Sequence, residues 1–167
     1  MNRDKILNPY IGLDGYNCFA CAPNNPIGLH LEFSEEGDNI VCVWKPSENF
    51  QGWVDTLHGG IQATLLDETC GWVVTRKLQT AGVTSSMETQ YKHPISIKEP
   101  FLTIRAHIKE QRRNLVTIDA SIEDSKGNIC THATCVYFVF SQEKAIRELH
   151  FRPCLTDRES SDIPHED

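Results

Sequence analysis

The amino-acid sequence predicts an α+β domain in which one long buried helix packs against a single antiparallel sheet. A helix is expected from residue 61 to about residue 78, because this run lacks proline and is rich in Leu, Ala, Gln, Glu, Arg and Lys. Two alternating apolar segments precede it and four follow it, which is an α+β order of elements. With 167 residues, 40% of them hydrophobic, the chain is long enough for one globular domain.

Charge and hydropathy exclude several classes of protein. The formal net charge of -7 argues against general nucleic-acid binding, which needs a basic surface. The chain has no run of 18 apolar residues, and residues 1–7 lack the apolar core of a signal peptide. Seven cysteines, an odd number, indicate reduced thiols rather than a disulfide framework. The sequence therefore predicts a cytoplasmic protein with no nucleic-acid and no membrane partner.

Three regions are expected along the chain. Residues 1–16 are predicted to form an N-terminal arm, residues 17–141 the domain, and residues 142–167 a C-terminal tail. Charge rises and patterning fades in the tail, so its end, residues 157–167, is predicted to be disordered.

A turn-rich loop with two cysteines is expected at residues 18–29. Its Cys18-x-x-Cys21 spacing is compatible with a zinc site, a redox pair or two free thiols. Free thiols are the favoured interpretation, because the other candidate ligands lie on one strand with Cys135 facing away from Cys130 and His132.

The six expected strands share an alternating pattern with one apolar face. In the segment 101–110, for example, Leu102, Ile104 and Ala106 share a face, and charged residues occupy the other. Long strands of this kind, wrapped around one apolar helix, form a curved antiparallel sheet known as the hotdog arrangement. The six segments are 29–33, 40–44, 83–91, 101–110, 115–122 and 129–140.

One side of the predicted helix carries small residues around a single carboxylate, Asp67. At about 100° per residue, Gly60, Ala63 and Gly71 fall on the same side as Asp67. A helix that is apolar over most of its circumference is usually buried, so this carboxylate is either structural or functional. Glu68 points about 100° away from Asp67 and is expected to be a solvated or interface residue.

Several motifs resemble those of hotdog acyl-CoA thioesterases of the phenylacetate-pathway (PaaI-like) type, over residues 18–140. The cysteine loop, Cys-x-x-Cys-x-x-x-Asn-Pro-x-Gly-Leu, is also frequent in that group. The resemblance implies hydrolysis of an acyl-CoA thioester without a metal or other cofactor. The motifs are Phe50-Gln51-Gly52, Leu57-His58-Gly59-Gly60-Ile61-x-Ala63-Thr64-Leu65-Leu66-Asp67, Gly82-Val83-Thr84 and Tyr91-Lys92-x-Pro94.

The resemblance also implies roles for individual residues. Gly59 matches a backbone amide that binds the oxyanion, Asp67 a general base or nucleophile, and Thr84 a hydroxyl that holds the attacking water. His58 matches the histidine before the helix and is expected to orient the chain there rather than to act as a base. Relatives often carry Asn or Gln where this chain has Gly52, and Gln51 is a candidate replacement.

The spacing of Gly59 and Asp67 predicts a site shared between two chains. Eight residues of helix separate them by about 12 Å, too far for both to act on one carbonyl. A twofold homodimer, alone or within a dimer of dimers, would bring Gly59 of one chain to Asp67 of the other. The substrate-binding candidates are Gln51, Gly60, Lys92, Arg112 and Arg113, the last three for the phosphates of CoA.

Two alternatives to the thioesterase interpretation remain open. Gly52, in place of an amide side chain, favours a catalytically weak acyl-CoA binder. A hotdog dehydratase or hydratase also pairs a histidine with a carboxylate across a dimer, but its Asp-x-x-x-x-His and His-Phe-Pro motifs are absent from the sequence.

Overall fold

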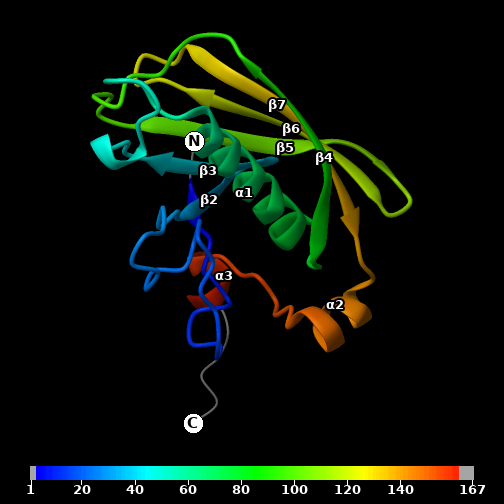
Figure 1. The fold of residues 1–167 in the computed structure, drawn as a ribbon. Coiled ribbons are helices and arrows are strands. Elements are labelled where there is room, and N and C mark those ends of the chain that lie inside the picture. Colours follow the sequence, from blue (N-terminus) through cyan, green and yellow to red (C-terminus); the bar gives the residue numbers. More distant parts are fainter. Residues whose placement is uncertain (1–2, 162–167) are drawn as a thin grey trace.

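The computed structural model describes residues 3–161, and its central elements follow the predicted order (Figure 1). Within these residues, one seven-stranded antiparallel sheet in the order β1-β2-β3-β5-β6-β7-β4 curves around the helix α1. The prediction of an α+β hotdog fold is confirmed. The elements are β1 (Asp4–Lys5), β2 (Phe33–Glu36), β3 (Asn39–Trp44), the 3-10 turn η1 (Glu48–Phe50), α1 (Gly59–Lys77), β4 (Gly82–Tyr91), β5 (Leu102–Arg112), β6 (Leu115–Glu123), β7 (Ile129–Val139), α2 (Gln142–Leu149) and α3 (Asp157–Ser161).

The strand expected at residues 29–33 lies further along the chain, at β2. The amides of Leu29 and Leu31 donate to the carbonyls of Phe19 and Ala20, both at 2.9 Å, and are therefore engaged with the cysteine loop instead of a strand partner. The sheet pairing with β3 begins only at Phe33. The alternation of apolar residues could not reveal this shift of the strand, because residues 29 and 31 bond to a loop and not to a neighbouring strand.

Segments near both ends of the described residues pack against the rest of the domain. The N-terminal arm contributes β1, which pairs with β2, and the buried Ile6 bridges to Thr156 near the C-terminus. The predicted disorder of residues 157–167 is wrong for Asp157–Ser161, which form α3, while residues 162–167 lie outside the described part of the chain. Arg76 of α1 stabilises this end by donating to the Cys154 carbonyl and to Glu159, both at 2.8 Å.

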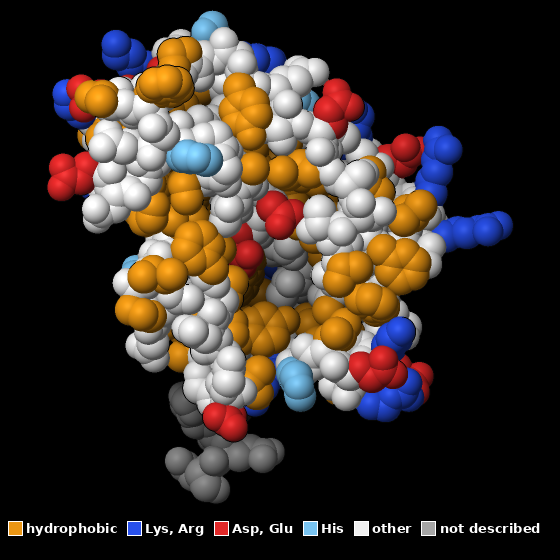
Figure 2. Space-filling model, in the orientation of Figure 1, with side chains coloured by type: hydrophobic (Ala, Val, Ile, Leu, Met, Phe, Trp, Pro, Cys, Tyr) orange, Lys and Arg blue, Asp and Glu red, His pale blue; other side chains and the backbone are white. Residues whose placement is uncertain are grey.

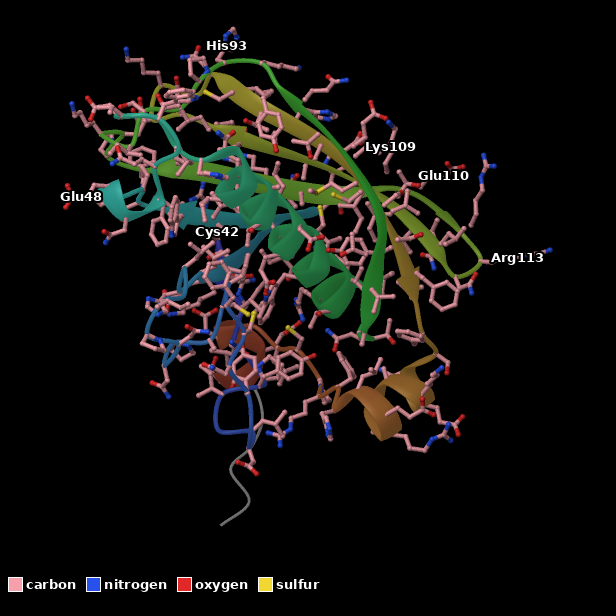
Figure 3. The ribbon with its side chains drawn as sticks, viewed as in Figure 1. Cys42, Glu48, His93, Lys109, Glu110 and Arg113 are labelled. Atoms are coloured by element: carbon pink, nitrogen blue, oxygen red, sulfur yellow. The ribbon has the colours of Figure 1, made fainter. Side chains whose placement is uncertain are left out.

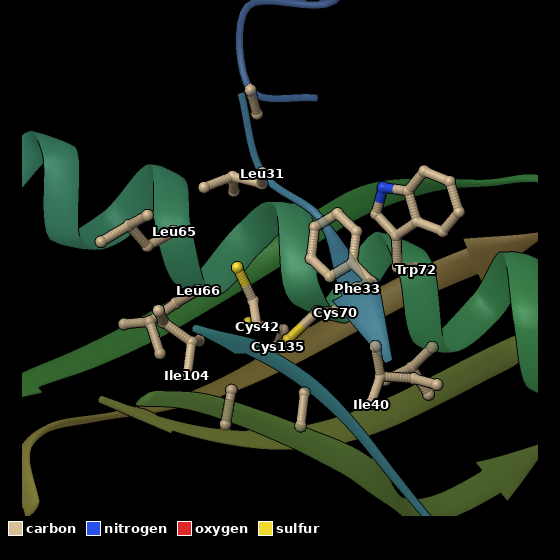
Figure 4. Packing of buried hydrophobic residues seen from close by; sticks show 14 of the residues in the cluster. Leu31, Phe33, Ile40, Cys42, Leu65, Leu66, Cys70, Trp72, Ile104 and Cys135 are labelled. Atoms are coloured by element: carbon tan, nitrogen blue, oxygen red, sulfur yellow. The ribbon is translucent and has the colours of Figure 1, made fainter. Parts of the chain in front are cut away.

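Helix α1 is buried on most of its sides, as its apolar composition predicts. Phe33 of β2 stacks on Trp72 of α1 with ring centroids 4.9 Å apart (Figure 4). The polar side chain of Gln62 is buried too, and it is satisfied: its Oε1 accepts from Thr131 of β7 at 2.5 Å and its Nε2 donates to the Leu57 carbonyl at 3.1 Å. These bonds fix the beginning of α1 on the sheet.

Strand β4 is the edge of the sheet next to the beginning of α1. One of its sides pairs with β7, and in the described chain the other side has no strand partner. Most of its residues are exposed on both faces. Long unpaired edges are normally protected in stable proteins, so this edge is an expected contact surface. No helix within residues 3–161 is long and apolar enough to cross a membrane.

Candidate active site

In the described part of the chain, the beginning of α1 presents backbone amides that have no acceptor, and the Gly59 N–H is one of them. The Gly60 N–H donates to His58 Nδ1 at 2.8 Å, and the Gln62 N–H donates to the His58 carbonyl at 3.1 Å. Within residues 3–161, nothing accepts from the Gly59 N–H. The first amides of a helix carry the positive end of its dipole, so the Gly59 amide is a suitable donor to an oxyanion.

His58 caps the helix through its imidazole. Because Nδ1 accepts from Gly60, the neutral ring carries its proton on Nε2 and holds no free base at Nδ1. The Gly60 amide, which was predicted to bind substrate, is therefore engaged by His58. Gly60 favours this close contact, since a Cβ at that position would crowd the imidazole, at 3.1 Å from His58 Nδ1.

Asp67 is held by two side chains from the sheet. Its Oδ1 accepts from the Thr84 hydroxyl of β4 at 2.7 Å and lies 2.8 Å from the Tyr137 hydroxyl of β7. The same Tyr137 hydroxyl lies 2.6 Å from the Asp67 carbonyl oxygen, so its one proton serves either acceptor. Among the described residues, Asp67 Oδ2 accepts no hydrogen bond and is free to accept a proton from water.

Tyr137 is a member of this site that the sequence analysis missed. Burial raises the pKa of Tyr137 above its usual value, and the negative charge of Asp67 raises it further, so the phenol remains protonated and donates. One signal was present in the sequence: Ala133, Cys135 and Tyr137 alternate along the last predicted strand, and all three are buried. The alternation could not tell which element Tyr137 faces.

The two halves of the predicted site lie at opposite ends of β4. At one end Thr84 pairs with Tyr137 in the sheet and contacts Asp67. At the other end the Tyr91 hydroxyl donates to the Gly59 carbonyl at 3.1 Å. Both halves are thus fixed by β4, and about 12 Å of helix separates them within one chain.

Gln51 and Gly52 lie in the loop before α1. The Gln51 side chain accepts from the Asp55 amide at 3.1 Å, so its carbonyl oxygen stabilises its own loop. A Cβ at Gly52 would lie 3.3 Å from His58 Cα, which leaves little room for a longer side chain there. The loop therefore does not direct the Gln51 oxygen into the space that an amide at position 52 would occupy.

The basic candidates fall into two separate groups. Arg112 pairs with Leu115 at the β5–β6 hairpin, Leu115 pairs with Phe138, and Phe138 pairs with Val83, so this group lies near the Thr84 end of β4. Figure 3 shows Arg113 at the tip of that hairpin and His93 at the far end of the sheet.

Lys92 belongs to the second group, because its amide donates to Cys130 just beyond the other end of β4. In one chain, Lys92 and the two arginines cannot serve the same phosphate group. Arg112 also forms an exposed ion pair with Glu110 at 2.5 Å, which leaves Arg113 as the freer cation of its group.

The face that carries α1 and β4 has little basic character. In Figure 2, Lys and Arg side chains lie around the margin of this face, whereas its hollowed centre shows hydrophobic, uncharged and acidic side chains. A surface of this kind is compatible with a contact between copies of the chain, with cations supplied from the margin.

Glu68, which was expected to be a solvated or interface residue, contacts other parts of its own chain. It is half-buried, and its Oε1 accepts from Trp72 Nε1 at 3.0 Å. The Cys18 thiol also points to this oxygen, at 3.7 Å. Glu68 therefore faces the cysteine loop, on a different side of α1 from Asp67.

The part of the chain that carries this site is similar to thioesterases of known sequence and structure. Residues 55–131, which include Gly59, Asp67 and Thr84, match the family model described as Thioesterase superfamily. Acyl-coenzyme A thioesterase 13 of Mus musculus is 34% identical over 80 residues, which are 47% of this chain and 56% of that protein. The chain thus matches little more than half the length of this curated relative.

Solved structures support the same fold. A thioesterase superfamily protein superposes with a TM-score of 0.66 at 23% identity, over 72% of this chain and 59% of that one. A hypothetical thioesterase from Streptococcus pneumoniae, solved with coenzyme A, superposes with a TM-score of 0.62 at 27% identity. The second alignment covers 67% of this chain and 87% of the streptococcal protein.

Proposed function

We propose that this protein hydrolyses acyl-CoA thioesters to the free acid and CoA. Two groups on α1 carry the proposal. The Gly59 N–H has no acceptor within the described residues and can donate to an oxyanion. The Asp67 carboxylate is oriented by hydrogen bonds from Thr84 and Tyr137. Thioester hydrolysis needs one donor for the developing oxyanion and one carboxylate for water. The thioesterase relatives, one of them solved with coenzyme A, support this choice of chemistry and substrate.

The active unit we infer is a homodimer, alone or as half of a dimer of dimers. A twofold axis beside β4 would pair its free edge with the same edge of a second copy and set the two α1 helices antiparallel. Gly59 of one copy would then face Asp67 of the other. The small residues on that side of α1, from Gly60 to Gly71, allow two helices to approach closely.

In this dimer, the Asp67 carboxylate would activate the water that hydrolyses the thioester. Asp67 Oδ2 takes a proton from water, the oxygen attacks the thioester carbon, and the Gly59 N–H of the other copy binds the oxyanion. The carbon–sulfur bond then breaks, and CoA leaves as the thiol after taking up the proton. In the alternative route, Asp67 itself attacks to form a mixed anhydride, which water hydrolyses.

The finer assignment is a PaaI-like thioesterase acting in the cytoplasm. It is supported by the motifs from His58 to Asp67 and by the Gly82-Val83-Thr84 segment that brings a hydroxyl to Asp67.

Turnover and binding must be measured together to test the proposal. We expect the purified protein to hydrolyse at least one member of a panel of short, long and aromatic acyl-CoAs, followed by loss of thioester absorbance because the protein has seven thiols of its own. Calorimetry on the same panel gives the affinities.

Binding without turnover would instead favour the second candidate, a catalytically weak acyl-CoA binder. The specific observation behind that candidate is the loop before α1, where Gly52 has no side chain and the Gln51 oxygen is engaged by Asp55. If the protein neither binds nor hydrolyses any acyl-CoA of the panel, both candidates are contradicted.

We expect the two arginines of the β5–β6 hairpin to bind the phosphates of CoA. Changing Arg112 and Arg113 to Glu should raise the KM for acyl-CoA about tenfold or more, because each change replaces an attractive charge near the phosphates with a repulsive one. The KM for a truncated thioester without the nucleotide should change little. The matched control is Lys126→Glu, a charge reversal in the exposed turn between β6 and β7, at the opposite end of the sheet from the β5–β6 hairpin. Equal effects on both substrates would show that the hairpin does not contact the nucleotide.

A further inference from the structure

Three potential metal ligands meet on a different side of α1 from Asp67. The Sγ atoms of Cys18 and Cys21 and a carboxylate oxygen of Glu68 all lie within 4.8 Å of one another. Two come from the N-terminal loop and the third from α1, 50 residues after Cys18. The proposed hydrolysis uses none of these groups, so the cluster needs a separate explanation.

The loop holds its two sulfur atoms in a defined turn. The Cys21 N–H donates to Cys18 Sγ at 3.4 Å, and the Tyr16 hydroxyl lies 3.0 Å from Cys21 Sγ. Backbone bonds also fix the loop itself, including Ala22 N–H to the Cys18 carbonyl at 3.1 Å. Hydrogen bonds to sulfur stabilise its anionic form, which is the form that binds metals.

Glu68 is oriented towards the sulfur atoms and lacks a cation of its own. Trp72 Nε1 donates to its Oε1 at 3.0 Å, which fixes the direction of the carboxylate. In the described part of the chain, no Lys or Arg forms an ion pair with Glu68, whereas Glu35 on the same side of the fold pairs with Arg76 and Lys77. A half-buried carboxylate beside two thiols would be stabilised by a bound cation.

The dimensions suit a small tetrahedral ion. With bonds of about 2.3 Å to sulfur and about 2.0 Å to oxygen, two ligands of tetrahedral zinc lie about 3.5 Å apart. The Cys18 Sγ and Glu68 Oε1 atoms are 3.7 Å apart. Cys21 also lines a cavity of about 540 Å³ together with Phe33 and Trp72, which gives the cluster an access path and room for a water ligand.

We propose that Cys18, Cys21 and Glu68 bind one zinc ion, with water as the fourth ligand. Two thiolates and one carboxylate favour zinc over magnesium or calcium, which prefer oxygen ligands alone. Binding releases a proton from each thiol that is protonated in the free protein. The ion joins the N-terminal loop to α1 at the residue after Asp67, so its role is to fix the loop and not to activate water for hydrolysis.

Metal content and metal spectroscopy test this site without reference to activity. We expect about one zinc per chain in full-length protein purified with reductant, and a loss of tenfold or more in zinc affinity in Cys18→Ser and in Cys21→Ser. The matched control is Cys130→Ser, a buried cysteine of β7 that lies outside the cluster. This control should bind zinc as the unchanged protein does.

Cobalt provides a second readout that separates ligation from folding. The cobalt-loaded protein should show the intense absorption of tetrahedral Co²⁺ with thiolate ligands; each of the two serine variants should weaken the thiolate band, and Glu68→Gln should shift the ligand-field bands. Circular dichroism confirms that each variant is folded. The proposal is wrong if the folded, reduced protein binds neither metal, or if Cys130→Ser lowers affinity as much as Cys18→Ser. Detection of a Cys18–Cys21 disulfide with no metal binding after reduction would likewise overturn it, in favour of a redox pair.

Discussion

Changing Asp67 to Asn should lower kcat for acyl-CoA hydrolysis by about a hundredfold or more, because the amide can act neither as base nor as nucleophile. The Asn Oδ1 can still accept from Thr84 and Tyr137, so the side chain should keep its place and the fold should survive. Steady-state kinetics with the best substrate of the panel measure the effect, and KM should change much less than kcat.

The matched control for this variant is Asp38→Asn. Asp38 is exposed in the turn between β2 and β3, so the substitution removes the same charge far from the proposed site. Its kcat should equal that of the unchanged protein. A folded Asp67→Asn protein that keeps full turnover would show that another group activates the water.

Mixing two inactive variants should restore activity if the site is shared between chains. One variant is Gly59→Pro, which removes the amide proposed to bind the oxyanion. The other is Asp67→Asn. In a mixed dimer one site carries both defects and the other carries neither, so each heterodimer should recover up to about half the normal rate. Activity is measured after the two proteins are dissociated, mixed and reassociated, with heterodimers confirmed by mass.

The position of Gly59 makes the proline variant a fair test. Gly59 is the first residue of α1, where proline is well tolerated, and the preceding His58 has φ -61° and ψ 134°, the extended backbone that a following proline requires. The control is Gly59→Ala, which keeps the N–H and adds a Cβ at an ordinary 3.5 Å from Tyr91. Alanine should retain most of the activity. Confirmed heterodimers without activity, or an enforced monomer with full activity, would refute the shared site.

Helix α1 and the later strands could be predicted because the patterns that indicate them lie within a few consecutive residues. The absence of proline and the composition after Gly60 predicted α1, and alternation predicted the strands from residue 83 onwards nearly to their ends. Helix and strand periodicity depend on neighbours a few residues apart, which the sequence displays directly.

The remaining features depend on partners far along the chain. β1 was missed because two residues, Asp4 and Lys5, are too few to show alternation. The contacts of Glu68, which was expected to be a solvated or interface residue, were not predicted because its neighbours Cys18 and Trp72 come together only in three dimensions. Tyr137 was missed for the same reason, being 70 residues from Asp67.

The resemblance located Gly59 and Asp67 but could not assign the amides around them. His58 and Gly60 stand two positions apart in the motif, and only the structure reveals that the ring of His58 accepts a hydrogen bond from the Gly60 N–H. From the motif alone, Gly59, whose N–H is free, could not be distinguished from Gly60, whose N–H is bound by the His58 imidazole.

The unpaired edge of β4 has a consequence for how the protein is made and kept soluble. Within residues 3–161, alternate residues of Gly82–Tyr91 direct backbone N–H and C=O groups to the side of β4 that has no strand partner. Such a strand can template the addition of foreign or misfolded chains. If the proposed dimer forms through this edge, resistance to aggregation should rise with protein concentration over the range in which the two copies associate, because association covers the edge.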